Sequence, residues 1–335
     1  MDQELSEAQL VGQESLRINI QIDTQELESS GLEEETSGVN EGEYETDPNQ
    51  AWTKCLKNPG HKNFIPFKNF SVTDLPQQYQ HQDIFNLIKY LGNLVVKISV
   101  AVTSTSRPKY KENKLYPCYT NKGLRKLRYG SGRVWDVQKF GEGDNRLCQC
   151  KNCQRSSSPF KCWGEVNIVT ATHVVFDNLE GQFAKCWWNY SHKDSNYTCL
   201  EGIGVVNSNI DTDLCYFRCV THDVQLVDRL KIGIDKYNEQ CEVVYQNFTK
   251  NLGTNAKLVA IVSHPHGNYR HVSVGECNQV SKTPSGETWY SYNTCTCQGS
   301  SGAPVYHLGK EKVRWSNHPH SGTDMPVNYS GVCWN

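Results

Sequence analysis

The sequence predicts an all-β protein built from two strand-rich halves. Short β-branched runs recur along the chain, for example at residues 94–104 and 258–265. Turn residues separate these runs at close intervals, which is typical of β-barrels and β-sandwiches. Two motifs stand out within this pattern: a Gly-Ser-rich turn at 297–306 (CQGSSGAPVY) and an apolar run with one histidine at 168–175 (IVTATHVV).

The first 50 residues differ from the rest of the chain in charge. They contain fourteen acidic residues and one Arg, so they carry about −13 of a total net charge of −2, and the remainder carries about +11. Few aromatic residues and low hydrophobicity leave this segment too little apolar surface to offset the entropy lost on folding. We expect an acidic disordered tail at 1–50, which either only solvates the chain or regulates it through a partner.

The beginning of the chain also bears on the cellular compartment. MDQELSEAQL lacks the basic and apolar regions of a signal peptide, and no run of about 18 apolar residues predicts a membrane span. We therefore expect an intracellular, cytoplasmic protein. In that compartment the fifteen cysteines are expected as thiols or metal ligands, although a cysteine-rich body is more usual in secreted proteins.

A linker and a short helix are expected ahead of the first strand. Residues 51–72 have the mixed composition of a linker. In 74–92 apolar side chains recur at helical spacing, at Ile84, Leu87, Ile88 and Leu91. Asp74 can begin this helix and Gly92 can end it.

The remaining chain, 93–335, reads as a series of strands. After the run at 94–104, the basic segment 107–128 is expected as a solvated loop, with nucleic-acid binding as the less favoured interpretation. The next strand contains Gly130 and Gly132, where we expect a kink or bulge. Later strands are expected at 182–188, 202–209, 213–219, 258–265, 271–277, 288–296, 304–308 and 312–318, with a partly helical connection at 224–250.

The turn at 297–306 has what acyl transfer requires. A serine in a Gly-rich turn can present its hydroxyl as a nucleophile, and successive backbone N–H groups can converge where an oxyanion develops. Upstream, His173 lies in IVTATHVV and Asp213 begins the apolar run DLCYF. A histidine can accept the serine proton, and a carboxylate can orient the imidazole. The chain thus carries a candidate base, acid and nucleophile in the order His173, Asp213, Ser301.

These motifs resemble those of trypsin-like (chymotrypsin-fold) serine proteases. VTATHVV is similar to their histidine motif, DLCYF to their aspartate motif and CQGSSGAP to their serine motif. GSGRV (130–134) and VSHPHGNYRHVSVG (262–275) are similar to the bacterial-type branch, which includes high-temperature-requirement and glutamyl-endopeptidase-like enzymes. The resemblance implies two packed six-stranded antiparallel β-barrels, at about 93–222 and about 250–325, with the active site between them.

The resemblance also implies a catalytic triad and an oxyanion hole. The triad consists of His173, Asp213 and Ser301. The backbone N–H groups of Gly299 and Ser301 form the oxyanion hole. Ser300, which also lies between small residues, remains an alternative nucleophile, and Asp211 remains an alternative acid.

Substrate-binding positions follow from the same resemblance. Trypsin-like zymogens carry an aspartate where this chain has Ser300, so activation by N-terminal cleavage is not expected. The position at the base of the specificity pocket is Cys295, which gives no support for a preference for Arg or Lys substrates. His320, Ser321 and Gly322 resemble the strand that pairs with substrate, and a histidine there suits an acidic or polar side chain.

A cysteine cluster lies in an insertion at 138–162. Cys148, Cys150, Cys153 and Cys162 have the spacing C-x-C-x2-C-x8-C, which is not that of a standard zinc finger. Structural zinc, disulfides and unliganded thiols all remain open for this cluster. The histidines of the two His-Pro-His runs, 264–266 and 318–320, are expected to be loop residues rather than ligands.

The sequence therefore predicts a serine endopeptidase that hydrolyses a protein or peptide substrate through an acyl-enzyme. It predicts no cofactor requirement for catalysis, a candidate structural zinc, and neither a membrane nor a nucleic-acid partner. Two alternatives remain. One is a catalytically inactive protein of the same fold that binds peptides in its cleft, and the other is a zinc-stabilised interaction module that uses the basic segment.

Overall fold

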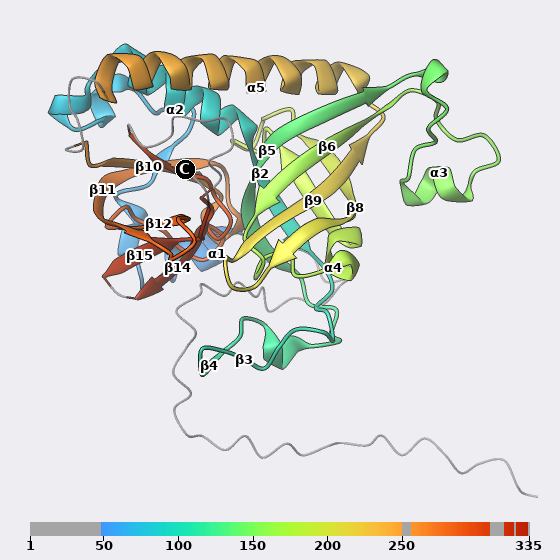
Figure 1. Ribbon diagram of the computed structural model, residues 1–335, viewed down its shortest axis with the longest axis horizontal. Helices are drawn as coiled ribbons and strands as arrows, with labels where there is room; N and C mark the ends of the chain where they lie inside the picture. Colours follow the sequence, from blue (N-terminus) through green and yellow to red (C-terminus); the bar gives the residue numbers. More distant parts are fainter. Residues whose placement is uncertain (1–47, 250–255, 309–317, 325, 334–335) are drawn as a thin grey trace, which may run out of the picture.

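The computed structural model describes residues 48–249, 256–308, 318–324 and 326–333 (Figure 1). The tail expected at 1–50 and the strand expected at 312–318 lie almost entirely outside these residues. The described chain is mostly β, with few helices, which confirms the predicted fold class.

Six antiparallel strands close the first barrel in the order β2-β5-β6-β9-β8-β7. Their bounds are β2 (Val95–Val100), β5 (Arg128–Phe140), β6 (Trp163–Thr170), β7 (Ala184–Trp188), β8 (Thr198–Asn209) and β9 (Leu214–Thr221). Every residue of β2 and β6 is buried. One face of these strands lines the barrel, and the other is covered by helices or by the second half of the chain. Continuous apolar runs are typical of strands covered on both faces.

The second half, called the second barrel below, forms a seven-stranded sheet in the order β13-β10-β11-β12-β15-β14, with β1 paired to β11 outside this order. The bounds are β10 (Leu258–Ser263), β11 (His271–Lys282), β12 (Thr288–Tyr292), β13 (Val305–His307), β14 (His320–Asp324) and β15 (Val327–Ser330). A single bridge between Pro304 and Pro319, which precede β13 and β14, joins the two ends. The sequence did not predict β1 (Ile65–Pro66), which pairs with the beginning of β11.

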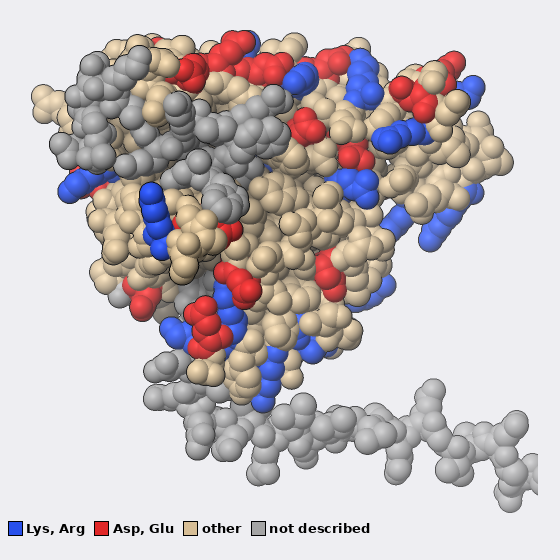
Figure 2. Space-filling model, viewed as in Figure 1, with Lys and Arg blue, Asp and Glu red and all other residues tan. Residues whose placement is uncertain are grey.

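Two helices lie side by side across both barrels (Figure 1). They are α2 (Gln82–Leu94) and α5 (Val224–Val244), so the connection after the first barrel is helical for most of its length. The Asp223 side chain caps α5 by accepting from the Leu226 backbone N–H. The apolar faces of α2 and α5 join one core with strands of the first barrel and with β10. The outer face of α5 carries interspersed acidic and basic side chains (Figure 2), including a Lys231–Asp235 ion pair at 3.1 Å.

Helix α2 begins later than predicted and passes through Gly92. Asp74 instead accepts from the Ser71 backbone N–H in a 3₁₀ turn, and Leu75, which precedes Pro76, is extended. Within α2, a Cβ atom at Gly92 would lie 2.0 Å from the ring of Phe67. Gly92 therefore permits close packing of the helix and does not end it.

The glycines of β5 have a similar role, so the predicted kink at Gly130 and Gly132 is wrong. β5 pairs with β2 without a register shift across both residues, and its irregularity lies later, between Val134 and Asp136. A Cβ atom at Gly130 would lie 2.5 Å from the Val174 side chain, and one at Gly132 would lie 2.8 Å from Ile98. Both glycines allow neighbouring segments to approach the strand.

The remaining elements are short. They are α1 (Pro48–Thr53), the hairpin β3 (Tyr110–Lys111) and β4 (Lys114–Leu115), α3 (Lys151–Arg155), α4 (Asn178–Gln182) and several 3₁₀ turns. Helix α3 lies in the insertion, which extends away from the first barrel (Figure 1). None of the helices in the described ranges is long and apolar enough to cross a membrane.

Candidate active site

His173 and Asp213 meet at the ends of two paired strands. β6 ends three residues before His173, and β9 begins at the residue after Asp213. The His173 Nδ1 atom lies 2.8 Å from Asp213 Oδ2, and the His173 backbone N–H donates to Asp213 Oδ1 over 3.0 Å. Both side chains are 3% exposed, whereas Asp211 is exposed. The structure therefore places Asp213, and not Asp211, against His173.

Asp213 remains ionised in this buried position. Burial by itself raises the pKa of the Asp213 carboxyl group, but His173 beside it and hydrogen bonds from His173 and Ser321 hold that pKa below its usual value. The Ser321 hydroxyl donates to Asp213 Oδ2. Hydrogen bonds to the charged form favour it, so the pocket stabilises the carboxylate.

The position of Asp213 sets the tautomer of the His173 ring. Because a carboxylate only accepts, Nδ1 of His173 is the donor in this contact. In the neutral ring Nε2 is then an acceptor. That atom is buried and has no hydrogen-bond partner within the described residues. His173 is thus arranged to accept a proton at Nε2.

The nucleophile loop, residues 297–303, packs against the strand that leads to His173. Gly299 and Gly302 have φ values of 86° and 80°, which favour glycine. A Cβ atom at Gly302 would lie 2.0 Å from Thr170 Oγ1, at the end of β6. Only glycine allows this approach, which brings the loop that contains Ser301 next to the His173 segment.

Hydrogen bonds from β5 and to β14 fix the nucleophile loop between the two barrels. The Ser131 backbone N–H donates to Ser301 O over 2.7 Å, and the Ser131 hydroxyl donates to Gly299 O over 2.6 Å. On the other side, the Gly302 N–H donates to His320 O over 2.8 Å. The loop is therefore held at both the first and the second barrel.

The hydroxyl of Ser300, the alternative nucleophile, is bonded within the second half of the chain. The Ser300 hydroxyl lies 3.1 Å from Ser263 Oγ and accepts from the Cys297 backbone N–H over 3.2 Å. Ser300 is fully buried, and its hydroxyl holds the loop in shape. This arrangement favours Ser301 over Ser300 as the nucleophile.

The carbonyls of two peptide groups in the loop, Gln298–Gly299 and Ser300–Ser301, each accept a hydrogen bond from a backbone N–H group. Gln298 O accepts from the His266 backbone N–H over 2.5 Å, and Ser300 O accepts from the Ala303 N–H over 2.9 Å. In a trans peptide group the N–H points away from the carbonyl. These bonds therefore fix the directions of the Gly299 and Ser301 N–H groups, which are the predicted oxyanion donors.

A cavity of about 510 Å³ lies beside the nucleophile loop, and its lining includes Lys57, Gln298 and Thr323. The Lys57 ammonium donates to Thr296 Oγ1 over 2.9 Å and to Asn328 Oδ1 over 3.2 Å. Burial lowers the pKa of Lys57 to about 8, so it is still mostly protonated at pH 7. The cavity is therefore bordered by a cation.

The predicted substrate-binding residues are not among those that line this cavity. Half-buried Cys295 directly precedes Thr296 and accepts from Asn63 Nδ2 over 3.3 Å. His320 is fully buried with Nδ1 2.7 Å from Tyr292 Oη, and burial holds its pKa well below the usual value. A neutral His320 offers hydrogen bonds but no positive charge. Ser321 and Gly322 follow His320 on β14.

A buried ion network supports the backbone at His173. The Glu180 carboxylate contacts Arg107 over 2.8 Å and also binds Arg128. The Arg107 guanidinium donates to His173 O over 2.9 Å, and Glu180 Oε2 accepts from the Phe176 N–H. Arg107 is 1% exposed, so this residue of the basic segment is buried, although the sequence predicted a solvated loop there.

We expect Glu180→Gln to lower the free energy of unfolding by about 3–5 kcal/mol, because it leaves two buried guanidinium groups without a carboxylate. Burial raises the pKa of Glu180, but Arg128 and Arg107 hold it below the usual value. The stabilisation is thus present above about pH 4 and decreases as the pH falls through the lower folded-state pKa. Urea unfolding of both proteins at several pH values measures this, and an equal stability at neutral pH would contradict it.

Among the residues that the structure describes, two groups of cysteine and histidine side chains have ligand atoms within 4.8 Å of one another. One consists of Cys148, Cys150, Cys153 and His222, and the other of Cys55, His61, His266 and Cys297. In the first group the sequence predicted Cys162 in the position that His222 occupies, and Cys162 is exposed. In the second group His266, from a His-Pro-His run expected to hold loop residues only, faces His61 and Cys297.

Sequence reasoning missed three contributions to this region. The Ser321 side chain bonds to Asp213, although only a substrate-binding role was predicted for it. Lys57 comes from a segment interpreted as a linker. His222 directly follows β9, 60 residues after Cys162. The only sequence signal for His222 is that a residue type able to bind metal lies at the end of a strand. Many cysteines and histidines lie at such positions, so this signal does not single out His222.

The family model of the lysyl endopeptidase C-terminal domain matches residues 137–323, which is more than half of the chain and includes His173, Asp213 and Ser301. The chain belongs to the lysyl endopeptidase family. This membership confirms the resemblance to serine proteases that its motifs show. No curated protein matches this member of the family in sequence.

Solved structures with a similar fold include proteases of two kinds. An HtrA-type protease, AlgW with a tripeptide, is 11% identical at a TM-score of 0.37, and the match covers 74% of this lysyl endopeptidase family member and 58% of AlgW. The active form of the Rv3671c protease from M. tuberculosis is 12% identical at a TM-score of 0.38, and the match covers 73% of this chain and 78% of the Rv3671c protease. This chain therefore spans less than two thirds of AlgW.

Proposed function

We propose that this protein is a serine endopeptidase that hydrolyses peptide bonds through an acyl-enzyme, with Ser301 as nucleophile, His173 as base and Asp213 as the acid that orients it. The observation that carries the proposal is the buried His173–Asp213 pair, in which Nδ1 is bonded to the carboxylate and Nε2 is an acceptor. The nucleophile loop packs against the same strand end.

The residues act in sequence. Ser301 Oγ attacks the carbonyl carbon of the scissile bond while its proton moves to His173 Nε2. The N–H groups of Gly299 and Ser301 bind the oxyanion, and each such donor contributes about 3 kcal/mol to transition-state stabilisation. The imidazolium, stabilised by Asp213, gives its proton to the leaving amine as the C–N bond breaks. Water then attacks the ester by the same route, which releases the acid product and restores Ser301.

The surroundings of Lys57 support a preference for an acidic side chain before the cleaved bond. The Lys57 ammonium is bonded to Thr296, next to Cys295 at the predicted base of the specificity pocket. A second ammonium or guanidinium would be repelled there, whereas a carboxylate would be attracted. The family to which the chain belongs is named for lysyl endopeptidase. We propose that this member does not share a lysine preference.

Cleavage of a peptide library by the wild type and by Ser301→Ala tests the proposed function. The wild type should cleave, with Asp or Glu enriched before the cleaved bond, and Ser301→Ala should not. Ser300→Ala is the matched control: it removes the hydroxyl that bonds to Ser263 and Cys297, so it should reduce cleavage but not abolish it. A library left intact by the folded wild type would instead support a catalytically inactive peptide-binding protein.

We also propose a structural zinc ion at Cys148, Cys150, Cys153 and His222. The His222 Nε2 atom lies 3.2, 3.7 and 3.4 Å from the three sulfurs, in that order. Tetrahedral zinc, with bonds of about 2.3 Å to sulfur and about 2.0 Å to nitrogen, separates these atoms by about 3.5 Å. Such an ion would fasten the insertion to the end of β9, and cysteine thiols persist as ligands in the cytoplasm expected for this protein.

We expect His222→Ala to lower the zinc content by about one ion per chain, because it removes one of four ligands. Cys162→Ser is the matched control and should leave the metal content unchanged, since Cys162 is exposed and outside the group. Elemental analysis of the purified proteins measures both. Retention of zinc by His222→Ala together with its loss in Cys162→Ser would favour the four-cysteine set that the sequence predicted.

A further inference from the structure

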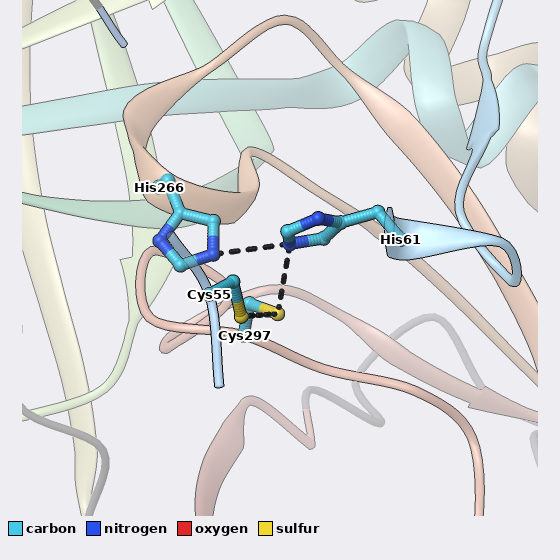
Figure 3. A group of neighbouring side chains, drawn as sticks. All are labelled: Cys55, His61, His266 and Cys297. Atoms are coloured by element: carbon cyan, nitrogen blue, oxygen red, sulfur yellow. Dashed lines mark hydrogen bonds between the residues drawn. The ribbon is translucent and has the colours of Figure 1, made fainter. Parts of the chain in front are cut away.

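The group Cys55, His61, His266 and Cys297 joins two distant parts of the chain. Cys55 and His61 belong to the segment before the first barrel, and Cys297 begins the nucleophile loop (Figure 3). His266 lies in the turn after β10. His61, His266 and Cys297 are buried or nearly so, and Cys55 is half-buried. A ligand bound by all four would be largely shielded from solvent, beside the cavity that Cys55 and His266 also line.

The separations of the four ligand atoms are those of a tetrahedral site. Cys55 Sγ lies 3.6 Å from Cys297 Sγ, His61 Nε2 lies 3.2 Å from His266 Nε2, and His61 Nε2 lies 3.4 Å from Cys297 Sγ. A tetrahedral zinc ion would separate two sulfurs by about 3.8 Å, two nitrogens by about 3.3 Å, and a sulfur from a nitrogen by about 3.5 Å. The two imidazoles and two sulfurs converge on one point in Figure 3.

Hydrogen-bond donors from Asn58 lie against both sulfurs. The Asn58 backbone N–H donates to Cys55 Sγ over 3.4 Å, and the Asn58 side-chain amide donates to Cys297 Sγ over 3.1 Å. Donors of this kind orient metal ligands and stabilise their charge. Trp52 stacks on the His61 ring with the centroids 3.8 Å apart, which holds the imidazole in place. The sulfurs are too far apart for a disulfide bond of about 2.05 Å.

We propose that Cys55, His61, His266 and Cys297 bind a structural zinc ion that fastens the segment before the first barrel to the nucleophile loop. Two thiolates and two imidazoles in a tetrahedral arrangement are a zinc donor set. With all four positions filled by protein, the ion has no open position for substrate or water. This site is separate from the group around His222.

The proposed ion would act on the oxyanion hole through two of its ligands. Cys297 directly precedes Gln298, and the His266 backbone N–H donates to Gln298 O. Both ligands therefore hold the peptide group whose N–H, at Gly299, is a predicted oxyanion donor. The ion would also anchor Cys55 and His61, which flank Lys57 beside the cavity. This consequence rests on the proposed function, whereas the metal site itself does not.

Metal content and cysteine accessibility test the site. We expect Cys55→Ser to lose about one zinc ion per chain relative to the wild type, while Cys199→Ser, an exposed cysteine of β8 outside both groups, keeps it. Cys148→Ser should lose the ion of the other site and not this one, so the two proposals are measured separately. Equal zinc content in Cys55→Ser and the wild type would overturn the proposal.

A second measurement on the wild type covers the case in which a variant does not fold. The native full-length protein is alkylated before and after treatment with a chelator, and the modified cysteines are located by mass spectrometry. Cys55 and Cys297 should be protected until the chelator removes the metal. Modification of Cys55 at the same rate with and without chelator, or recovery of a Cys55–Cys297 disulfide from the native protein, would contradict the proposal. Metal loss with cleavage unchanged would contradict only the coupling to the oxyanion hole.

Discussion

Replacing His173 by Ala should lower kcat by about a millionfold, because Ser301 then has no base to accept its proton. The structure gives this residue a single arrangement: Nδ1 bonded to Asp213 and Nε2 without a partner in the described chain. No other imidazole is bonded to Asp213 in the described residues. The measurement is kcat on a peptide identified from the library, with near-ultraviolet circular dichroism to confirm folding.

The double variant His173→Ala/Ser301→Ala tests whether His173 and Ser301 act as one catalytic unit. Residues that act as one catalytic unit have strongly non-additive effects, so the double variant should be about as slow as either single one. His264→Ala is the matched control, since His264 is also fully buried but bonds to Asn268 O. It should change stability and leave the catalytic unit in place. Additive losses from His173 and Ser301 would show that the two residues do not act together.

Replacing Asp213 by Asn should lower kcat by about ten thousandfold with little change in the fold. The Asp213 carboxylate accepts from His173 Nδ1, from the His173 backbone N–H and from Ser321. An amide can donate to Nδ1, and this favours the tautomer that carries its proton on Nε2. The base would then be blocked while the side chains keep their places.

Asp211→Asn is the matched control for this change, because Asp211 is exposed and precedes the same strand. It should leave kcat within about twofold. Ser321→Ala should give a smaller loss than Asp213→Asn, since it removes one of three hydrogen bonds to the carboxylate. If Asp211→Asn inactivated the protein and Asp213→Asn did not, the acid would be assigned wrongly.

Patterns within single elements allowed much of the fold to be predicted. The β-branched runs predicted β2 and β10, which are buried along their whole length. The start of α2 was misplaced because Asp74, a good capping residue, closes a 3₁₀ turn before Pro76 instead. Gly92 was interpreted as a helix end, and Gly130 and Gly132 as a kink or bulge. Their roles instead depend on side chains that are distant in sequence, such as Phe67 and Val174.

The proposed catalytic residues could be named from sequence because each lies in a motif of its own. The metal groups could not, because their members are far apart: His222 joins cysteines at 148–153, and Cys297 joins Cys55 across 242 residues. The tertiary fold brings these residues together, and no local sequence pattern predicts their contacts. The ammonium of Lys57 beside the proposed specificity pocket was missed for the same reason, since Lys57 comes from the segment interpreted as a linker.

The most direct test of the triad is labelling with a fluorophosphonate, which reacts only with a serine activated by its neighbours. The purified full chain is treated with the probe, and the adduct is located by peptide mass spectrometry. We predict one adduct, on Ser301, that is absent in Ser301→Ala and strongly reduced in His173→Ala. No adduct on the folded wild type, or an adduct that persists in Ser301→Ala, would contradict the account.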